Sequence, residues 1–406
     1  MGRKSVDDAL RERTVMTNIY LVGAVATPVA EHFGRSLADL ASEAVRGAFA
    51  AVPRLAPSQV GALFVANALG DRLAGQGQLG AYLGAAVGLR GVPAARVEAA
   101  GASGGVAIQQ AAYAIAAGAV EVAVVLGAEK VTDQLDGALE AALALAMDAE
   151  AEALHGLTLT AQWAMLMRRY MHEHGYAADA FAPFPVNAHA NAARNPQALY
   201  RFAISADKYR KAGQIASPLN MLDCSSVADG AACLILASER VARELAQPAV
   251  PLVRLAGTAV ATDVPALGAR PDPLDLVAAR ASAQIALGRA HLGLGDVHVL
   301  ELSDPHGIAA ALALEAIGYY GRGEAPRHAA DGAIAPSGRT PIATAGGYKA
   351  RGDLAGASGV YQLVELLRQL RGEAGATQVA GAKVALAQSL GGVGSTAATC
   401  VLVAES

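Results

Sequence analysis

The sequence predicts an α/β protein with two βαβ-rich halves, in which helices and sheets pack as layers. Short runs rich in Val, Leu and Ala alternate with helical segments along the chain. The composition is 53% hydrophobic but only 4% aromatic, with 44 glycines, which suits close packing of helices on sheets. At 406 residues one core rarely suffices, so two domains or a duplicated core are expected.

Seven short apolar runs are predicted as strands, each beside a helical segment. The predicted strands are residues 18–29, 120–129, 231–238, 252–264, 297–304, 383–392 and 396–405. Helices are predicted over residues 36–52 and 307–320, and after the turns that begin at Gly101 and Gly356. A short β-compatible run from residue 96 ends at the Gly101 turn, so strand, tight turn and helix are expected there.

Strand character is lost between residues 131 and about 220, where the only tryptophan, Trp163, stands among Met- and His-bearing helical segments. This stretch is interpreted as a loop domain inserted into the first half. The predicted domains are therefore residues 1–245, including the loop domain, and residues 246–406.

Two pairs of segments indicate an internal duplication. "NIYLVGAVATPV" (18–29) is echoed by "LVRLAGTAVATDV" (252–264), and "GASGGVAIQQAAYAI" from Gly101 is echoed by "GASGVYQLVELLRQL" from Gly356. The paired glycines lie 234 residues apart in the first case (Gly23 and Gly257) and 255 in the second, in the same order. A shared order at nearly constant separation favours duplication over chance.

Charge and cysteine usage exclude several classes of protein. The net charge is −4 with both signs mixed, so no nucleic-acid-binding surface is expected. No membrane helix and no leader segment are predicted, so the chain is expected to be cytoplasmic. Cys224, Cys233 and Cys400 form no CxxC pair, which argues against a disulfide framework or a metal site and favours buried small side chains.

Four segments together resemble the thiolases, especially the lipid-transfer-protein and archaeal type of thiolase-like proteins. They are "VEAAGASGG", "NAHANAARNP", "PLNMLDCSSVADGAA" and "GGYKARGDLAGASG", in that order. The resemblance extends from Ile19 to Val403. It implies a duplicated five-layer αβαβα thiolase fold, a coenzyme A thioester as ligand with no tightly bound cofactor, and a homodimer or a dimer of dimers.

The resemblance also implies three catalytic positions, and this chain departs from the family at each. Thiolases of this kind use a cysteine in "EAACASG", a histidine in "GHP" and a cysteine or asparagine in "CIGG" or "NIGG". The matching residues here are Gly101, Asp353 and Ser389. Glycine cannot hold an acyl group, which excludes acyl transfer through position 101. An ionised Asp353 accepts hydrogen bonds but donates none.

Three side chains remain candidate bases for a reaction without a covalent intermediate: Tyr348, His306 and Asp353. Tyr348 follows a Gly-Gly pair where the family has leucine, and His306 in "SDPHG" stands where the family has an aromatic residue. Each has a structural alternative. Tyr348 could be half-buried with its hydroxyl at the surface, His306 a helix N-terminal residue satisfied by solvent, and Asp353 the cap of the following helix. A serine nucleophile, Ser103 or Ser389, lacks an activating histidine motif, and Ser103 is better explained as a capping hydroxyl.

Candidate ligand-binding residues follow from the same motifs. His189, Gly391 and Gly392 match the family pattern, and together with Gly101 they are predicted to approach the thioester. Lys349 and Arg351 are candidates for a coenzyme A phosphate, with an ordinary solvated face as the alternative. The run "KYRKAG" (208–213) is a second candidate for the same role.

The sequence thus predicts a thiolase-like acyl-CoA-binding protein without thiolase chemistry. A non-catalytic subunit is slightly preferred, paired with an active thiolase or with a small zinc-ribbon/OB-fold protein. The alternative is a retro-aldol lyase acting on a β-hydroxyacyl-CoA, which needs a base and enolate-stabilising donors but no nucleophile. An acetyl-CoA acetyltransferase activity would follow from the family alone.

Overall fold

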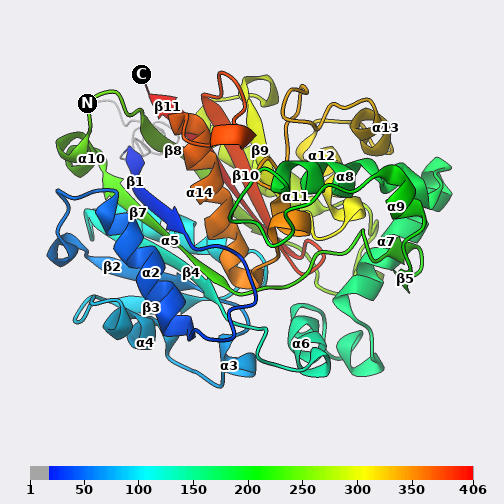
Figure 1. Cartoon of the computed structure of the whole chain (residues 1–406), viewed down its shortest axis with the longest axis horizontal. Helices are drawn as coiled ribbons and strands as arrows, with labels where there is room; N and C mark the ends of the chain where they lie inside the picture. The colour runs from blue at the N-terminus through cyan, green and yellow to red at the C-terminus, as the bar shows by residue number, and fades with distance from the viewer. Residues whose placement is uncertain (1–17, 406) are drawn as a thin grey trace, which may run out of the picture.

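A nine-stranded sheet runs through the molecule in the computed structural model, which describes residues 18–405 (Figure 1). The strand order is β3-β2-β4-β7-β1-β8-β11-β10-β9. The strands are β1 (Ile19–Ala26), β2 (Ala62–Ala66), β3 (Ala94–Val97), β4 (Val122–Glu129), β7 (Gly230–Ser238), β8 (Leu252–Thr262), β9 (Val299–Leu302), β10 (Val384–Gly391) and β11 (Thr396–Glu405). The two halves of the sheet meet where β1 pairs antiparallel with β8.

Helices cover both halves and also fill the space between them. The outer helices of the first half are α2 (Leu37–Ala50), α4 (Leu79–Ala86) and α10 (Glu239–Leu245). The central helices α5 (Ser103–Ala116) and α14 (Ser358–Arg371) contact each other and strands of both halves. On the far side lie α11 (Val277–Ala290) and α12 (Gly307–Ile317). Helix, sheet, helix, sheet and helix follow in turn, which is the predicted five-layer arrangement.

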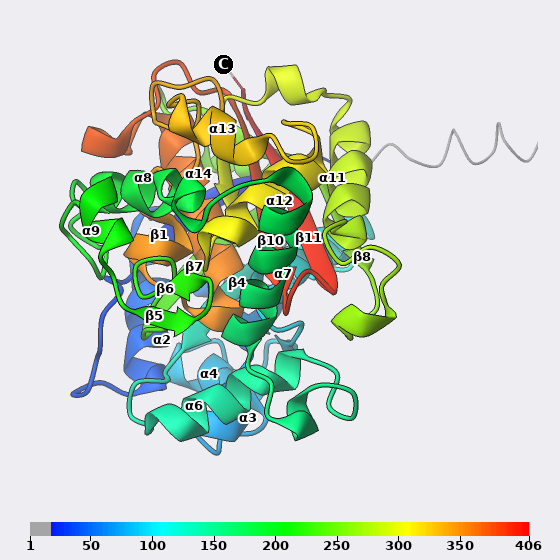
Figure 2. The ribbon, with the colours of Figure 1, turned by 90° about the vertical axis from the view of Figure 1, so that its right-hand side faces the viewer.

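The segment after β4 is mostly helical. Figure 2 shows α6 (Asp136–Leu143), α7 (Leu159–His174), α8 (Pro183–Ala192) and α9 (Ala206–Arg210) on one side of the molecule, with the small hairpin of β5 (Gln214–Ala216) and β6 (Leu219–Asn220). The short helices α3 (Gly70–Leu73) and α13 (Ala325–Ala330) complete the set of α-helices among residues 18–405. The boundary between residues 245 and 246 stays a prediction.

All seven predicted strands are present, and the edge strand β3 is the short β-compatible run expected before the Gly101 turn. The structure adds β2, which was not predicted. β2 has only five residues, "ALFVA", and β3 is "AARV", whose first two residues are exposed. β3 lies at the edge of the sheet and pairs only with β2, so it needs no long apolar run.

The duplication extends to hydrogen bonds in the two helix-opening turns. Ala100 and Ala355 both adopt a left-handed backbone, with φ of 49° and 43°. The Ser103 hydroxyl accepts the N–H of Ala99 at 2.8 Å, and its repeat partner Ser358 accepts the N–H four residues before it at 2.9 Å. Ser103 is fully buried and closes the turn, because its hydroxyl also donates to the Ala100 carbonyl oxygen at 2.6 Å. The predicted capping of α5 by this hydroxyl is wrong: the N-cap residue is Ala102, and no side chain caps the helix.

The two central helices cross at paired glycines near their N-termini. A Cβ atom on Gly104 would lie 2.7 Å from the Cα of Gly359, and one on Gly359 would lie 2.8 Å from the backbone nitrogen of Gly105. The close approach brings both helix N-termini to the same place, and the site described below lies there.

Cys233 and Cys400 are buried as predicted, Cys224 is half-buried, and all three thiols are free. None of the helices within residues 18–405 is long and apolar enough to cross a membrane. In the same range, no cluster of three His, Cys, Asp or Glu side chains could hold a metal ion.

Candidate functional site

A cavity of about 480 Å³ opens beside the N-termini of α5 and α14. Eight stretches of chain meet around it, from the ends of β3 and β9 to the helices α6 and α7. No cysteine is among the described residues that line it. Its polar lining includes Arg72, Arg96, Glu98, Glu140, Thr160, Ser225, Ser303, His306, Tyr348 and Asp353.

Gly101 lines this cavity at the position where the family carries its nucleophile. A Cβ atom there would lie 2.4 Å from the carbonyl oxygen of Leu390, at the end of β10. The neighbouring contact is similar, because a Cβ on Gly391 would lie 2.4 Å from the Ala99 carbonyl oxygen. Backbone atoms therefore pack directly against the turn at Gly101, and a side chain there would fit only if the backbone near Leu390 moved.

Tyr348 lies in a π-helical turn (Gly347–Arg351), and its ring lines the cavity with 2% of the residue exposed. The Tyr348 N–H donates to Asp304 at 2.6 Å, which fixes the turn against the end of β9. The phenol oxygen is buried and has no hydrogen-bond partner of good geometry among the described residues. Burial raises the pKa of Tyr348, so its hydroxyl stays protonated near neutral pH. The surface-hydroxyl alternative is wrong.

His306 is the N-cap residue of α12 and faces the same cavity. Its ring lies 6.2 Å from that of Trp163, and 6% of the residue is exposed. Burial, followed by the positive charge of Lys349, lowers the pKa of His306 to about 3. The ring is thus neutral at physiological pH, and its buried Nδ1 has no partner among the described residues. Solvent does not satisfy it, contrary to the structural alternative.

Asp353 combines a structural role with a place in the cavity wall. Its Oδ1 accepts the N–H of Ala355 at 2.9 Å, and its Oδ2 receives only a long 3.5 Å contact from Ser225. Glu98, 255 residues earlier, makes the equivalent bond to Ala100 N–H at 2.7 Å and also lines the cavity. Asp353 therefore holds the turn before α14, but it is not the predicted helix cap, because the N-cap residue of α14 is Ala357 and no side chain caps that helix. Burial raises the pKa of Asp353 above its ordinary value.

Other predicted site residues lie away from this cavity. Ser389 is buried in β10, where its hydroxyl oxygen would lie 2.6 Å from a Cβ on Gly105, and it is absent from the lining. His189 is buried on α8, with Nδ1 at 3.1 Å from the Phe202 carbonyl oxygen, and burial with the Lys349 charge lowers its pKa to about 4. Of the two predicted glycines of the C-terminal turn, Gly392 lines the cavity and Gly391 does not.

Lys349 and Arg351 are buried, with 4% and 1% of each residue exposed, so the solvated-face alternative is wrong. Neither lines the cavity, and burial lowers the pKa of Lys349 to about 8. Both belong to the buried π-helical turn, which corrects their expected placement at the cavity mouth. The lysines of "KYRKAG", Lys208 and Lys211, are exposed on or next to α9 and also lie outside the lining.

The sequence analysis missed the apolar wall of the cavity. It is formed by Leu69, Ala142, Leu143, Leu145, Ala146, Leu159 and Trp163. Most of these residues lie between residues 131 and 220, where Trp163 was the only one of them singled out in the sequence. The wall gives the cavity an apolar side opposite its polar groups, as in pockets for amphipathic ligands.

Family models match almost the whole described chain. "Thiolase, N-terminal domain" matches residues 19–240, and "Thiolase C-terminal domain-like" matches residues 259–404. The chain belongs to the thiolase family. A thiolase-like acyl-CoA protein is therefore what the fold and the family support, although the nucleophile position holds Gly101.

Relatives of this thiolase-family protein include both acyltransferases and lyases. It is 34% identical to an acetyl-CoA acetyltransferase of Methanothermobacter thermautotrophicus, over 94% of this chain and 98% of the relative. It is 32% identical to the 17-hydroxy-3-oxo-4-pregnene-20-carboxyl-CoA lyase of Mycobacterium tuberculosis, over 87% and 91%. Among solved structures, the Ltp2-ChsH2(DUF35) aldolase is similar with a TM-score of 0.82 and 28% identity, over 96% of this chain and 99% of that one.

Proposed function

We propose that the protein is a lyase that cleaves a β-hydroxyacyl-CoA by a retro-aldol reaction. The observation that carries the proposal is the convergence of Tyr348, His306 and Asp353 on one cavity whose nucleophile position is a closed glycine turn. Retro-aldol cleavage requires proton transfer and stabilisation of an enolate, and no covalent acyl-enzyme. A non-catalytic subunit would not need the unpartnered Tyr348 hydroxyl and His306 Nδ1 in this cavity.

The proposed step balances without a co-reactant. A base removes the proton of the β-hydroxyl, the Cα–Cβ bond breaks, and its electron pair becomes the enolate of the shortened thioester. The β-carbon leaves as a ketone or aldehyde. The enolate then takes up one proton at Cα, which gives the second product, a shorter acyl-CoA.

The three side chains divide these tasks by their protonation states. Tyr348 is a neutral phenol with an unused hydroxyl, so it is assigned to donate a hydrogen bond to the developing enolate oxygen. Asp353, with a raised pKa and a weakly engaged Oδ2, is assigned to accept the β-hydroxyl proton. The neutral His306 ring is assigned to hold that hydroxyl through its free Nδ1.

Two of the similar proteins support this assignment by their names, one a CoA-ester lyase and the other an aldolase. The aldolase is a complex with a DUF35 component, which supports a partner subunit here as well. We propose a small zinc-ribbon/OB-fold partner, in agreement with the sequence analysis. Binding of the coenzyme A thioester, without a tightly held cofactor, belongs to the same proposal.

The test is calorimetry of the purified protein with acetyl-CoA and with a β-hydroxyacyl-CoA, with the same mixtures assayed for cleavage products. The expected result is binding of both ligands and release of acyl-CoA plus a carbonyl compound from the second. Tyr348→Phe and Asp353→Asn should each lower kcat by about 10²- to 10⁴-fold and leave ligand binding within a few-fold.

A matched control is Tyr319→Phe, which removes a phenol oxygen far from the cavity lining and should leave kcat unchanged. Binding without cleavage, with and without the small partner, would favour the non-catalytic subunit. No binding of either thioester would leave assembly as the role and overturn the lyase.

A further inference from the structure

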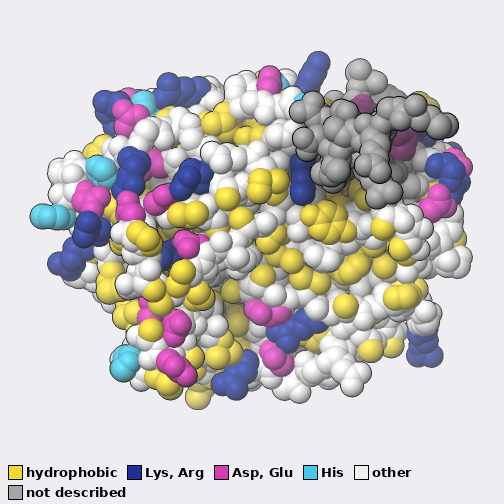
Figure 3. All heavy atoms as spheres, turned by 180° about the vertical axis from the view of Figure 1, so that it is seen from behind, with side chains coloured by type: hydrophobic (Ala, Val, Ile, Leu, Met, Phe, Trp, Pro, Cys, Tyr) yellow, Lys and Arg dark blue, Asp and Glu magenta, His cyan; other side chains and the backbone are white. Residues whose placement is uncertain are grey.

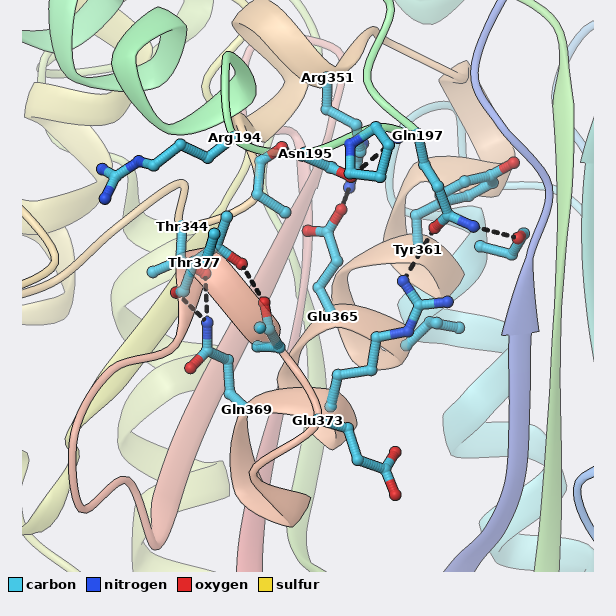
Figure 4. Close-up of a pocket in the computed structure, with 18 of the residues that line it drawn as sticks. Arg194, Asn195, Gln197, Thr344, Arg351, Tyr361, Glu365, Gln369, Glu373 and Thr377 are labelled. Carbon is cyan, nitrogen blue, oxygen red and sulfur yellow. Dashed lines mark hydrogen bonds and ion pairs between the residues drawn. The ribbon is translucent and has the colours of Figure 1, made fainter. Parts of the chain in front are cut away.

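A second pocket of about 360 Å³ lies alongside α14 and shares no lining residue with the first cavity (Figure 4). Its walls come from α14, from residues 194–197 after α8, and from residues 373–377 after α14. No step of the proposed cleavage uses it.

The floor of this pocket is an incompletely satisfied ion pair. Figure 4 shows Arg351 reaching toward Glu365 on α14, and Arg351 Nη1 lies 2.9 Å from Glu365 Oε1. The side chains are only 1% and 8% exposed. Even so, Nε and Nη2 of Arg351 and Oε2 of Glu365 have no partner among the described residues. Unpaired buried groups of this kind are costly, so the floor offers unused donors beside an unused acceptor.

The walls favour a negatively charged ligand. Three arginines line the pocket against two glutamates, and Glu365 already pairs with Arg351. Arg368 donates to Gln197 at 2.8 Å through one nitrogen only, and Arg194 lies at the exposed rim. Guanidinium groups recognise carboxylates through paired N–H donors, and a bound cation or a purely apolar ligand would leave these donors without partners.

We propose that this pocket binds a small hydroxycarboxylate. The ligand carries two carboxylates, one paired with Arg368 and the other with the free N–H groups of Arg351, and its hydroxyl donates to Glu365 Oε2. A ligand with a carboxylate but no hydroxyl leaves that acceptor unpaired, so the hydroxyl provides discrimination.

The same guanidinium connects the two pockets. Arg351 lies 5.6 Å from the centre of the Tyr348 ring and 5.2 Å from that of Tyr361. A carboxylate beside Arg351 would weaken the positive charge felt by the Tyr348 phenol. An effect of the ligand on cleavage rests on the proposed function, but binding itself does not.

The test is calorimetry of the full chain with L-malate, succinate and inorganic phosphate at constant ionic strength. We expect saturable binding of one L-malate per chain, at least tenfold tighter than succinate or phosphate. Arg368→Gln should weaken malate at least tenfold, and Arg327→Gln, which removes an exposed arginine elsewhere, should not change it. Saturating acetyl-CoA should leave malate bound.

Three results would overturn the proposal: no saturable malate binding, equal or tighter binding of succinate or phosphate, or undiminished malate binding by a folded Arg368→Gln variant. Displacement of malate by acetyl-CoA would assign it to the first cavity and also overturn the proposal. Loss of cleavage with intact malate binding would instead count against the lyase alone.

Discussion

Position 101 illustrates how one missing side chain changes both packing and chemistry. With no Cβ at Gly101, the Leu390 carbonyl oxygen occupies space that any other residue would need. The turn has therefore adapted to glycine, so restoring a thiol by Gly101→Cys would require the end of β10 to move. The cavity also holds Asp353 where a thiolase would hold histidine.

Gly101→Ala is expected to lower the free energy of unfolding by about 1–3 kcal/mol, because the added methyl group overlaps the Leu390 carbonyl. Urea denaturation measures the change. Gly288→Ala is the matched control, since Gly288 is exposed on α11 with open space around it and should gain up to about 1 kcal/mol. An unchanged midpoint for Gly101→Ala would show that the turn is looser than described.

His306 couples the site to pH through its burial. Its folded-state pKa of about 3 lies below the unfolded value near 6.5, so between these values the unfolded chain binds more protons. The stability that the neutral ring contributes is complete above pH 6.5 and is lost as the pH falls toward 3. Asp304, whose pKa burial raises to about 7, acts in the opposite direction, so only a difference between variants isolates the histidine.

The difference in unfolding free energy between the wild type and His306→Gln should therefore depend on pH. It should be constant above pH 7. As the pH is lowered from 6 to 4.5, the unfolding free energy of the wild type should fall relative to that of the variant by about 1 kcal/mol per pH unit. Urea titrations at several pH values measure it. A flat difference for His306→Gln would mean that the ring binds a proton as readily in the folded protein as in the unfolded chain.

Among the secondary-structure elements, the best predicted were those that occur in both copies of the duplicated sequence. The Gly-Ala-Ser-Gly echo located the N-termini of α5 and α14, because both turns use the same serine hydrogen bond. β2 was missed because its five-residue apolar run is too short to stand out. The π-helical turn that buries Lys349 and Arg351 was also missed, since exposed positions are the usual place of charged residues.

The crossing of α5 and α14 should not tolerate a side chain. Gly359→Ala places a methyl group within 2.8 Å of the Gly105 backbone nitrogen, so the helices must separate or the chain must unfold more easily. The expected loss is about 2 kcal/mol or more of unfolding free energy, with a lower Tm in calorimetry. Gly372→Ala is no suitable control because of its positive φ, so Gly288→Ala serves again. A Gly359→Ala protein with wild-type Tm would contradict the tight crossing.

For the whole molecule, the resemblance predicted the fold, but only the three-dimensional structure shows which residues lie together in the site. Tyr348, His306 and Asp353 were each singled out in sequence, and the structure brings them to one cavity. The apolar wall of that cavity and the second pocket were not predictable, because each joins segments more than 100 residues apart. The local hydrophobic periodicity of a sequence carries no information about contacts between segments that are distant along the chain.

One face of the molecule carries hydrophobic side chains gathered across its middle (Figure 3). Exposed apolar residues also occur on α5 and α11: Tyr113 on α5 is 41% exposed, and Ile285 on α11 is 45% exposed. Arg289 on α11 reaches toward α5, with its Nη1 atom 3.4 Å from the Tyr113 hydroxyl oxygen. Large exposed apolar areas commonly mark interfaces between subunits.

The predicted homodimer should therefore use the surface of α5 and α11. Light scattering at micromolar concentration is expected to give about twice the 40.9 kDa of one chain. The double variant Tyr113→Glu/Ile285→Glu should reduce this to a single chain, because two buried unpaired carboxylates would oppose association. Leu154→Glu is the control: Leu154 is 78% exposed in the inserted segment, so its change should leave the mass doubled. A wild-type mass of one chain would contradict the dimer, and an unchanged dimer in the double variant would assign it to another face.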